Sequence, residues 1–323
     1  MKKILLPLML AGLMLTACGN NQTSDNSNGE YDRSSLSIVC PTGAPALAFY
    51  RYSTYSNFET NSDPSTGILP QMIAGQKDIV VLPTNAGVQA ILNKNANYQI
   101  AATITFGNFY LLSMNNDENN TLDENDTILL FQKGNVPDKI FHYVYGDTYN
   151  SNIHYVSAVS DAAAAANAGS FVDADTGERM VPNYVMLAQP VLQTVLSKNT
   201  EKGYKVYDNI QEKYKEKSNN LPLFQASVFV KKTVDKKKAD SFLSSLKDDV
   251  QVALETPVAI ASYLKKIENP NQVYGIDPTL GELITKNGNG MGLGFEYAKE
   301  NKAAVETFLK LFNIEGFDEE VYY

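Results

Sequence analysis

Three short turns in this sequence carry residues suited to holding a polar or anionic group of a ligand. The first, Pro-Thr-Gly-Ala-Pro-Ala at 41–46, follows an apolar run at 36–40 and precedes a segment that can begin a helix. A similar turn, Leu-Pro-Thr-Asn, occupies 82–85, and a less similar one, Lys-Gly-Asn-Val-Pro-Asp, occupies 133–138. A strand that turns directly into a helix leaves backbone N–H groups unpaired, and these groups can cradle an anion. An ordinary strand–helix turn is the alternative interpretation of the first turn.

Residues that could perform catalysis are scarce. The two histidines, His142 and His154, fall inside a predicted helix and a predicted strand, where a histidine is usually structural. The sequence contains no Gly-x-Ser-x-Gly, His-Glu-x-x-His or Cys-x-x-Cys motif. Asp-Ala-Asp-Thr-Gly at 173–177 has scattered acids but lacks the distal Glu of a calcium-binding loop. We therefore expect a protein without catalytic activity, bound metal or cofactor.

The first residues are typical of a secretion signal. Lys2 and Lys3 precede an apolar run at 4–15, and Leu-Thr-Ala-Cys at 15–18 ends it. The run is shorter than the roughly 20 residues that a membrane-spanning helix needs. The Leu-Thr-Ala-Cys ending is similar to a bacterial lipobox, so we expect residues 1–17 to be removed and Cys18 to carry a lipid such as palmitate. A plain signal peptide with a chance cysteine is the alternative.

Composition restricts the remaining possibilities. Residues 18–35 are rich in Asn, Ser, Asp and Gly, so they cannot bury enough surface to fold and are predicted to be a flexible tether. The chain has 27 basic and 36 acidic side chains, a net charge of −9, which repels nucleic acid and excludes it as a partner. Cys40 is the only cysteine besides Cys18, which excludes a disulfide framework.

From residue 36 onward, short apolar runs alternate with helix-like stretches, a pattern typical of mainly parallel sheets covered by helices. A folded body of about 290 residues is large for a single core and favours two domains. Strands are predicted at 36–40, 78–82, 98–105, 108–114, 127–131, 153–157, 184–188, 204–207 and 224–230. Helices are predicted at 44–55, 68–74, 86–93, 136–145, 161–169, 190–197, 210–217, 231–255, 257–267, 280–285 and 295–312.

Taken in order, several segments resemble one family, the solute-binding lipoproteins of ABC importers in the nitrate/sulfonate/taurine and thiamine-precursor group. The six segments lie at 41–45, 75–87, 107–113, 132–138, 184–192 and 224–230. They include Gln-Lys-Asp-Ile-Val-Val-Leu-Pro-Thr-Asn within 75–87 and Leu-Ala-Gln-Pro-Val-Leu within 184–192. The similarity covers almost all of 36–311. Members of this family often carry Glu where this chain has Gln189, and the neutral amide removes a charge that would favour a cationic ligand group.

The resemblance implies an α/β chain with the type II periplasmic-binding-protein fold, in which two α/β lobes face each other across a ligand cleft. The first lobe would comprise 36–115 and 229–323, and the second lobe, with hinge segments, would comprise 116–228. Two hinge crossings are expected, near 114–126 and 226–230. The polar, acidic stretch at 115–126 is consistent with the first of these crossings.

The resemblance also implies which residues line the cleft, because open α/β sheets bind ligands at the carboxyl ends of their strands. The implied ligand-binding residues are Thr42, Gly43, Ala44, Thr84, Asn85, Asn108, Tyr110, Asn135, Val136, Asp138 and Gln189.

The function implied by the resemblance is that of an extracytoplasmic substrate-binding protein of an ABC importer. It would capture a small polar organic solute that is sulfonate-, carboxylate- or pyrimidine-like and deliver it to a membrane permease. We expect a monomer held on the outer face of the cell membrane by the lipid on Cys18. One alternative is a surface lipoprotein that binds a protein partner through an exposed apolar patch. Another is a pyrimidine-synthesis enzyme of the same fold, although the sequence lacks that enzyme's Cys-rich iron-binding run.

Overall fold

A computed structural model of the chain describes residues 31–115, 121–270, 274–275 and 290–323. Within it, Asp32–Tyr323 form one compact unit. The predicted signal peptide, Cys18, the tether up to residue 30 and the predicted helix at 280–285 lie outside the described residues. Among the described residues, no helix is both long enough and apolar enough to cross a membrane.

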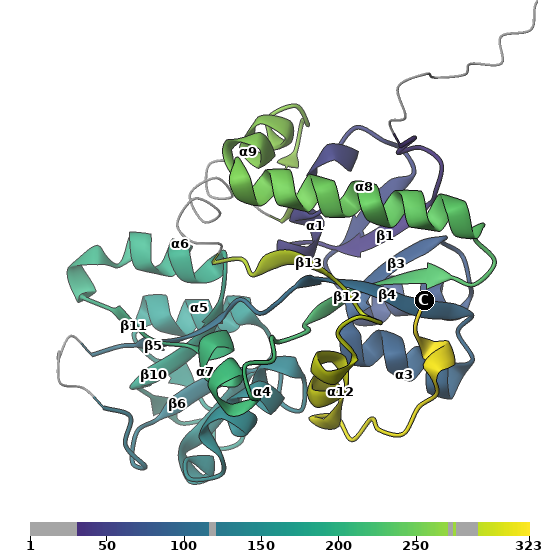
Figure 1. The fold of residues 1–323 in the computed structure, drawn as a ribbon. Helices are drawn as coiled ribbons and strands as arrows, with labels where there is room; N and C mark the ends of the chain where they lie inside the picture. The colour runs from purple at the N-terminus through teal and green to yellow at the C-terminus, as the bar shows by residue number, and fades with distance from the viewer. Residues whose placement is uncertain (1–30, 116–120, 271–273, 276–289) are drawn as a thin grey trace, which may run out of the picture. The chain divides into compact units, whose positions relative to one another are not determined.

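The first of two large sheets contains, among the described residues, six strands in the order β13-β4-β12-β3-β1-β2 (Figure 1). The strands are β1 (Ile38–Pro41), β2 (Phe58–Asn61), β3 (Ile79–Pro83), β4 (Tyr98–Thr105), β12 (Ala226–Lys231) and β13 (Leu293–Tyr297). β1 is parallel to β2 and β3, whereas β12 runs antiparallel to β3 and β4. β1 and β3 therefore end at the same edge of the sheet, where the first two turns lie.

The second sheet contains five strands within the described ranges, in the order β11-β5-β10-β6-β7. They are β5 (Phe109–Ser113), β6 (Ile128–Phe131), β7 (Ile153–Val156), β10 (Tyr184–Ala188) and β11 (Lys205–Asn209). β10, β6 and β7 are mutually parallel, and β5 is antiparallel to β10 and β11. A small hairpin of β8 (Phe171–Val172) and β9 (Arg179–Met180) is separate from both sheets.

Helices cover the faces of the sheets, with α8 on one side of the first sheet and α3 and α12 on the other (Figure 1). The helices around the first sheet are α1 (Ala44–Leu47), α2 (Leu69–Ile73), α3 (Thr84–Lys94), α8 (Lys236–Glu255), α9 (Val258–Leu264) and α12 (Lys302–Lys310). Those around the second sheet are α4 (Val136–Tyr145), α5 (Val159–Ala168), α6 (Val191–Lys198) and α7 (Ile210–Lys217).

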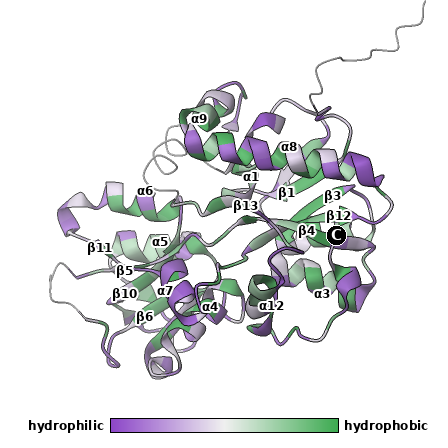
Figure 2. Cartoon of the chain, in the orientation of Figure 1, coloured by the Kyte–Doolittle hydropathy of each residue, from purple (hydrophilic) through white to green (hydrophobic). Residues whose placement is uncertain are grey.

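The core follows the apolar pattern of the sequence. The strands at the centre of each sheet are hydrophobic along their length, whereas helices such as α8 have one apolar and one polar face (Figure 2). Phe242, Leu246 and Val250 recur at helical spacing on α8 and are buried, as the predicted amphipathic helix requires. The alternation of strands and helices predicted from the sequence is therefore confirmed.

Three predicted helices have different bounds. The helix predicted at 231–255 begins at Lys236, because the Asp235 side chain accepts a hydrogen bond from the Lys238 N–H and caps it. The helix predicted at 44–55 is shorter, and a 3-10 turn at Tyr50–Tyr52 follows it. The prediction of a helix at 295–312 is wrong at its start, because Leu293–Tyr297 form a strand that pairs with β4.

The chain passes between the two sheets earlier than the sequence suggested. β5 (Phe109–Ser113) pairs with β10 in the second sheet, so the first crossing lies at 106–108 and not within 114–126. The return crossing occupies 218–225, between α7 and β12. Gly107 has φ +96°, a conformation that favours glycine, which lets the chain change direction here. The remaining lobe boundaries stay predictions.

Candidate functional site

A cavity of about 600 Å³ lies where turns from both sheets meet. The first sheet contributes the turns after β1, β2 and β3 and the start of β12, and the second contributes the turns after β6 and β10. Its lining residues are Pro41, Thr42, Gly43, Ala44, Pro45, Ser62, Asp63, Pro64, Ser65, Pro83, Asn85, Ala86, Asn108, Phe109, Phe131, Gln132, Asn135, Val136, Pro137, Val159, Ala188, Gln189, Pro190, Val191, Gln225 and Ala226. The topology thus brings residues from widely separated parts of the chain to one cavity.

Most of the residues implied by the family resemblance lie on this cavity. Those that line it are Thr42, Gly43, Ala44, Asn85, Asn108, Asn135, Val136 and Gln189. Thr84, Tyr110 and Asp138 are not among the lining residues. Each of these three side chains instead has a partner inside the protein.

Thr84 is fully buried at the start of α3. Its hydroxyl shares a 2.7 Å hydrogen bond with the Ser227 hydroxyl, which shares another of 2.7 Å with Thr103. This hydroxyl chain ties α3, β12 and β4 together. The Thr84 hydroxyl is therefore used for packing inside the protein, whereas the next residue, Asn85, lines the cavity.

Asp138 lies in the first turn of α4 and is buried. One carboxylate oxygen accepts the Gly134 N–H at 2.7 Å, and the other accepts the Tyr155 hydroxyl at 2.7 Å. His142 Nε2 lies 3.1 Å from the second oxygen. The Asp138 carboxylate thus holds the loop at 132–135 from behind the cavity wall.

The aromatic lining differs from the expectation for Tyr110. The Tyr110 hydroxyl donates to the Gly290 carbonyl at 3.2 Å, and burial raises the pKa of this tyrosine. Phe109 and Phe131 line the cavity instead, with ring centroids 6.1 Å apart. β5 alternates its side chains, so Phe109 and Tyr110 lie on opposite faces of the sheet.

The turn after β1 is held by the protein's own carbonyl groups. Gly43 has φ +90°, and its N–H donates to the Tyr274 carbonyl at 2.6 Å. The Thr42 N–H donates to the Asn61 carbonyl at 3.1 Å. These two N–H groups are therefore already committed, and neither belongs to the unpaired cradle that was expected at this turn.

A chain of amides joins the two crossings at the cavity wall. The Asn108 side-chain N–H donates to the Gln189 carbonyl at 2.8 Å, and the Gln189 N–H donates back to the Asn108 carbonyl at 2.9 Å. The Gln225 side-chain N–H donates to Asn108 Oδ1 at 3.3 Å. Gln225 was not identified from the sequence, although it lies in one of the segments that resemble the family.

The segment after β2 also lines the cavity without having been predicted. Asp63 caps the following turn, because its carboxylate accepts the Ser65 N–H at 2.9 Å and the Thr66 hydroxyl at 2.7 Å. The Thr66 hydroxyl, then backbone N–H groups, lower the pKa of Asp63. The Asn-Ser-Asp-Pro sequence is a turn signal that could have marked this wall.

Two basic side chains near the lining segments in sequence, Arg51 and Lys133, contact other groups of the protein. Arg51 lies 3.2 Å from the buried carboxylate of Asp249, which also takes hydrogen bonds from Arg33 at 2.8 and 2.9 Å. Burial raises the pKa of Asp249 despite these two cations. The Lys133 ammonium lies 5.0 Å from the centroid of the Tyr155 ring. Asp63 is the only charged side chain among the described residues that line the cavity.

Both histidines have carboxylate neighbours away from the cavity. His154 Nδ1 lies 2.6 Å from Asp173, and hydrogen bonds from His154 and then Thr176 lower the pKa of Asp173 to about 2. His142 belongs to the Asp138 network. Within the described part of the chain, no group of three or more His, Cys, Asp or Glu residues is placed to hold a metal.

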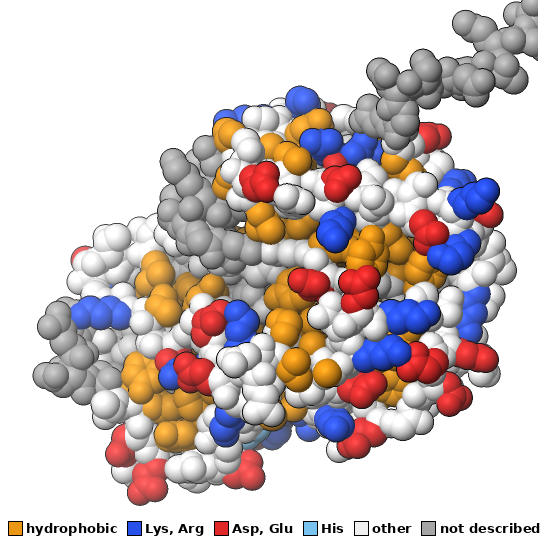
Figure 3. Space-filling view, viewed as in Figure 1, with side chains coloured by type: hydrophobic (Ala, Val, Ile, Leu, Met, Phe, Trp, Pro, Cys, Tyr) orange, Lys and Arg blue, Asp and Glu red, His pale blue; other side chains and the backbone are white. Residues whose placement is uncertain are grey.

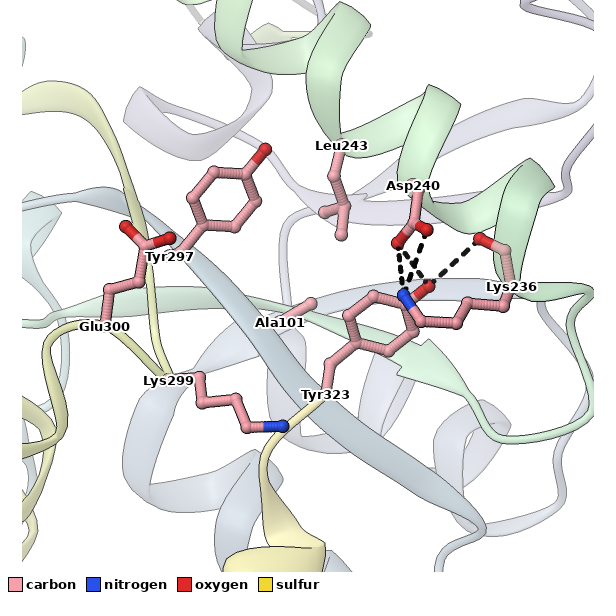
Figure 4. A pocket seen from close by; sticks show the side chains of 8 residues that line it. All are labelled: Ala101, Lys236, Asp240, Leu243, Tyr297, Lys299, Glu300 and Tyr323. Atoms are coloured by element: carbon pink, nitrogen blue, oxygen red, sulfur yellow. Dashed lines mark hydrogen bonds and ion pairs between the residues drawn. The ribbon is translucent and has the colours of Figure 1, made fainter.

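A second hollow, of about 300 Å³, lies between α8 and the chain's last residues (Figure 4). Three of its polar side chains pair with one another: Lys236 bonds to Asp240 at 2.9 Å, and the Tyr323 hydroxyl donates to Asp240 at 2.9 Å. The larger cavity is therefore the better candidate site.

On the face shown in Figure 3, acidic and basic side chains are interspersed across the surface.

Comparison with known proteins identifies the fold. No protein-family model matches the sequence, and no curated protein matches it either. An ABC transporter structure from Parabacteroides distasonis has a TM-score of 0.64 and 19% identity, over 85% of this chain and 91% of that one. The periplasmic aliphatic sulphonate binding protein SsuA from Escherichia coli has a TM-score of 0.58 and 12% identity, over 85% of each chain.

A third structure, a Candida albicans protein with the generic periplasmic binding protein fold, has a TM-score of 0.52 and 12% identity. The match covers 88% of this chain and 92% of that one. The chain therefore has the type II periplasmic-binding-protein fold, with two α/β lobes and the cavity where they meet. The predicted fold class is confirmed.

Proposed function

We propose that this protein is the substrate-binding component of an ABC importer, and that it captures a small polar organic solute in the cavity between its lobes. The observation that carries the proposal is the cavity of about 600 Å³ lined by turns from both sheets. Sites for small molecules typically measure about 300–1,000 Å³ and combine apolar walls with a few polar groups. The eight implied residues named above as lining the cavity, with Gln225, are the proposed ligand-contacting set.

The solute class implied by the resemblance is sulfonate-, carboxylate- or pyrimidine-like. The likeness to an aliphatic sulphonate binding protein supports transport of a compound of this size, as an analogy of fold. Closure of the two lobes would bury the solute, and the closed protein would dock on a membrane permease as a monomer.

Lipid anchoring and an extracytoplasmic location belong to the same proposal. Cys18 follows Leu-Thr-Ala at the end of the apolar N-terminal run, which supports its lipidation. Residues 18–35 would then tether the body to the outer face of the membrane. No catalysis is proposed, because both histidines contact carboxylates outside the cavity.

A thermal-shift screen tests the capture of a solute. The purified protein is mixed with pyrimidines, sulfonates, small carboxylates and nitrate, and Tm is measured at several concentrations. A true ligand at 100 times its Kd should add about 2.7 kcal/mol to the free energy of unfolding and raise Tm. Cells in which the gene has been deleted should also fail to take up any compound that raises Tm. If no compound changes Tm, the capture of these solute classes is contradicted.

A further inference from the structure

We propose that the cavity selects an uncharged solute that offers N–H or O–H donors, and that the side-chain amides of Asn85 and Gln225 recognise those donors. This inference rests on the proposed capture function and narrows its solute class. It separates this protein from a binder of sulfonates or carboxylates. Three observations carry it: the charge of the wall, the commitment of its N–H groups, and two acceptor oxygens without partners.

The charge of the described wall disfavours an anion. Asp63 is its only charged side chain, and hydrogen bonds to the turn after it keep that carboxylate ionised. Arg51 is committed to Asp249, and Lys133 lies over the Tyr155 ring. An anionic solute would therefore exchange water for a described wall whose one charged side chain is negative, and no cation of that wall would compensate for the lost hydration.

Several backbone N–H groups beside the cavity are already in use. In the first lobe, Gly43 N–H donates to Tyr274 and Thr84 N–H donates to the Gln225 carbonyl at 3.0 Å. In the second lobe, the Asp138 carboxylate takes the Gly134 N–H at the start of α4.

Side chains also accept backbone N–H groups beside the starts of α5 and α6. Asp161 accepts the Ala158 N–H at 3.0 Å, and Gln189 Oε1 accepts the Gln193 N–H at 3.2 Å. The acidic side chains Asp138 and Asp161 also occupy the helix ends that would otherwise attract a negative ligand. An anion would have to displace these contacts to use the same N–H groups.

Two acceptor oxygens of the wall have no hydrogen-bond partner among the described residues. They are Oδ1 of Asn85 and Oε1 of Gln225, and both are buried. A buried polar atom without a partner is costly, and each such atom in a native protein calls for an explanation such as a ligand, an ion or an ordered water. A small rotation of these side chains would turn the oxygens toward the cavity, and a solute that donates N–H or O–H groups to them would then remove that cost.

The orientation of the Gln225 amide follows from the bonding around it. The Gln189 carbonyl can only accept, so Asn108 must present its N–H group there and its Oδ1 elsewhere. Oδ1 of Asn108 accepts the Gln225 N–H, which leaves Gln225 Oε1 as the free acceptor. The backbone thus sets which end of the Gln225 amide is available to a solute.

The expected solute is an amide, urea or N–H heterocycle, with Phe109 and Phe131 supplying apolar wall for a flat body. Calorimetric titration of the protein compares three groups of probes. The first group is uracil and cytosine, the second is 1,3-dimethyluracil, which lacks N–H donors, and the third is ethanesulfonate, acetate and nitrate. We expect a probe of the first group to bind at least about tenfold more tightly than every probe of the other two, a difference of about 1.4 kcal/mol.

Each outcome is decisive. If an anion, or 1,3-dimethyluracil, binds as tightly as the donor-bearing probes, the inference is overturned while the capture function stands. If no probe in any group binds, both the inference and the capture of these solute classes are overturned.

Variants test the two amides directly. Asn85→Ala and Gln225→Met should each weaken binding of the best donor-bearing probe by about tenfold and bring its affinity closer to that of 1,3-dimethyluracil. Asn93→Ala removes an exposed amide from the same helix as Asn85 and should leave both affinities unchanged. A general loss of affinity, with the ratio between the two probes preserved, would contradict recognition by these amides.

Discussion

At the scale of single residues, Asp138 shows how a side chain can shape a site without lining it. Its carboxylate joins the Gly134 N–H, the Tyr155 hydroxyl and His142 behind the loop that carries Asn135. The family resemblance implied a ligand contact here. The structure instead gives the carboxylate a complete set of internal partners, which makes Asp138 a positioning residue for the wall.

Asp138→Asn should therefore lower stability and weaken solute binding together. The amide keeps the size of the side chain but replaces one acceptor oxygen with a donor, so either the Gly134 N–H or the Tyr155 O–H loses its acceptor on this side chain. A buried donor without a partner costs about 1–3 kcal/mol, and urea denaturation should show a loss of that size. Asp175→Asn, at an exposed carboxylate outside this network, is the control and should have little effect. Unchanged stability in Asp138→Asn would contradict the positioning role.

Asp173 gives the protein an acid-sensitive contact. Hydrogen bonds from His154 and Thr176 lower the pKa of Asp173 to about 2, below the value of about 3.9 in an unfolded chain. The stabilisation is therefore present above pH 4 and is lost as the pH falls toward 2. We expect Asp173→Asn to be less stable than the natural protein at pH 6 and to show a smaller difference at pH 2.5, measured by urea denaturation. An equal difference at both pH values would be inconsistent with this assignment.

At the scale of elements, α3 is positioned by its close approach to β12. Gly87 faces the buried ring of Phe229, and a methyl group added to Gly87 would lie 2.1 Å from that ring. The helix can therefore lie flat on the sheet, which places Asn85 in its first turn at the cavity.

Gly87→Ala tests this packing, because two effects compete. Alanine is favoured over glycine inside a helix by about 1 kcal/mol, whereas overpacking a tight core typically costs about 1–3 kcal/mol. The clash with Phe229 should win, so we expect a net loss of stability in thermal unfolding. Phe229→Leu should restore part of that loss, and Gln89→Ala, on the exposed side of α3, should not reduce stability. A more stable Gly87→Ala protein would rule out the tight contact.

Local patterns in the sequence predicted most of the elements, and the exceptions depend on distant contacts. The short run at 293–297 became a strand because it pairs with β4, almost two hundred residues earlier in the chain. The first crossing was expected in the polar stretch at 115–126, but strand pairing sets it at 106–108. Thr84 could not be separated from Asn85 as a ligand contact, because its partner Ser227 is distant in sequence.

At the scale of the whole molecule, the order of the segments was more informative than any one of them. The six segments at 41–45, 75–87, 107–113, 132–138, 184–192 and 224–230 supported a two-lobed fold, and the solved structures confirm that fold. The chemistry of the cavity was less predictable. Whether a backbone N–H is free depends on which carbonyl lies near it, as the bond from Gly43 to Tyr274 illustrates.

Anchoring of the whole protein is tested at Cys18. Cys18→Ser should leave the folded body unchanged but move the protein from the membrane fraction to the medium or periplasm, since a lipid chain contributes about 0.8 kcal/mol per buried CH₂. Fractionation and metabolic labelling with palmitate measure both effects. Cys40→Ser, at a buried cysteine, is the matched control and should stay on the membrane. Equal fractionation of the Cys18 variant and the natural protein would contradict lipid anchoring.

The crossing between the lobes has a consequence for how this chain can diverge. A methyl group on Gly292 would lie 2.0 Å from the Gly107 carbonyl oxygen, and both residues have positive φ. Because the obstacle is main chain, no compensating substitution nearby can make room for it. Mutational drift can thus remodel the walls of the cavity and its solute preference, while these two positions remain fixed as glycine in any descendant that keeps the same passage between its halves.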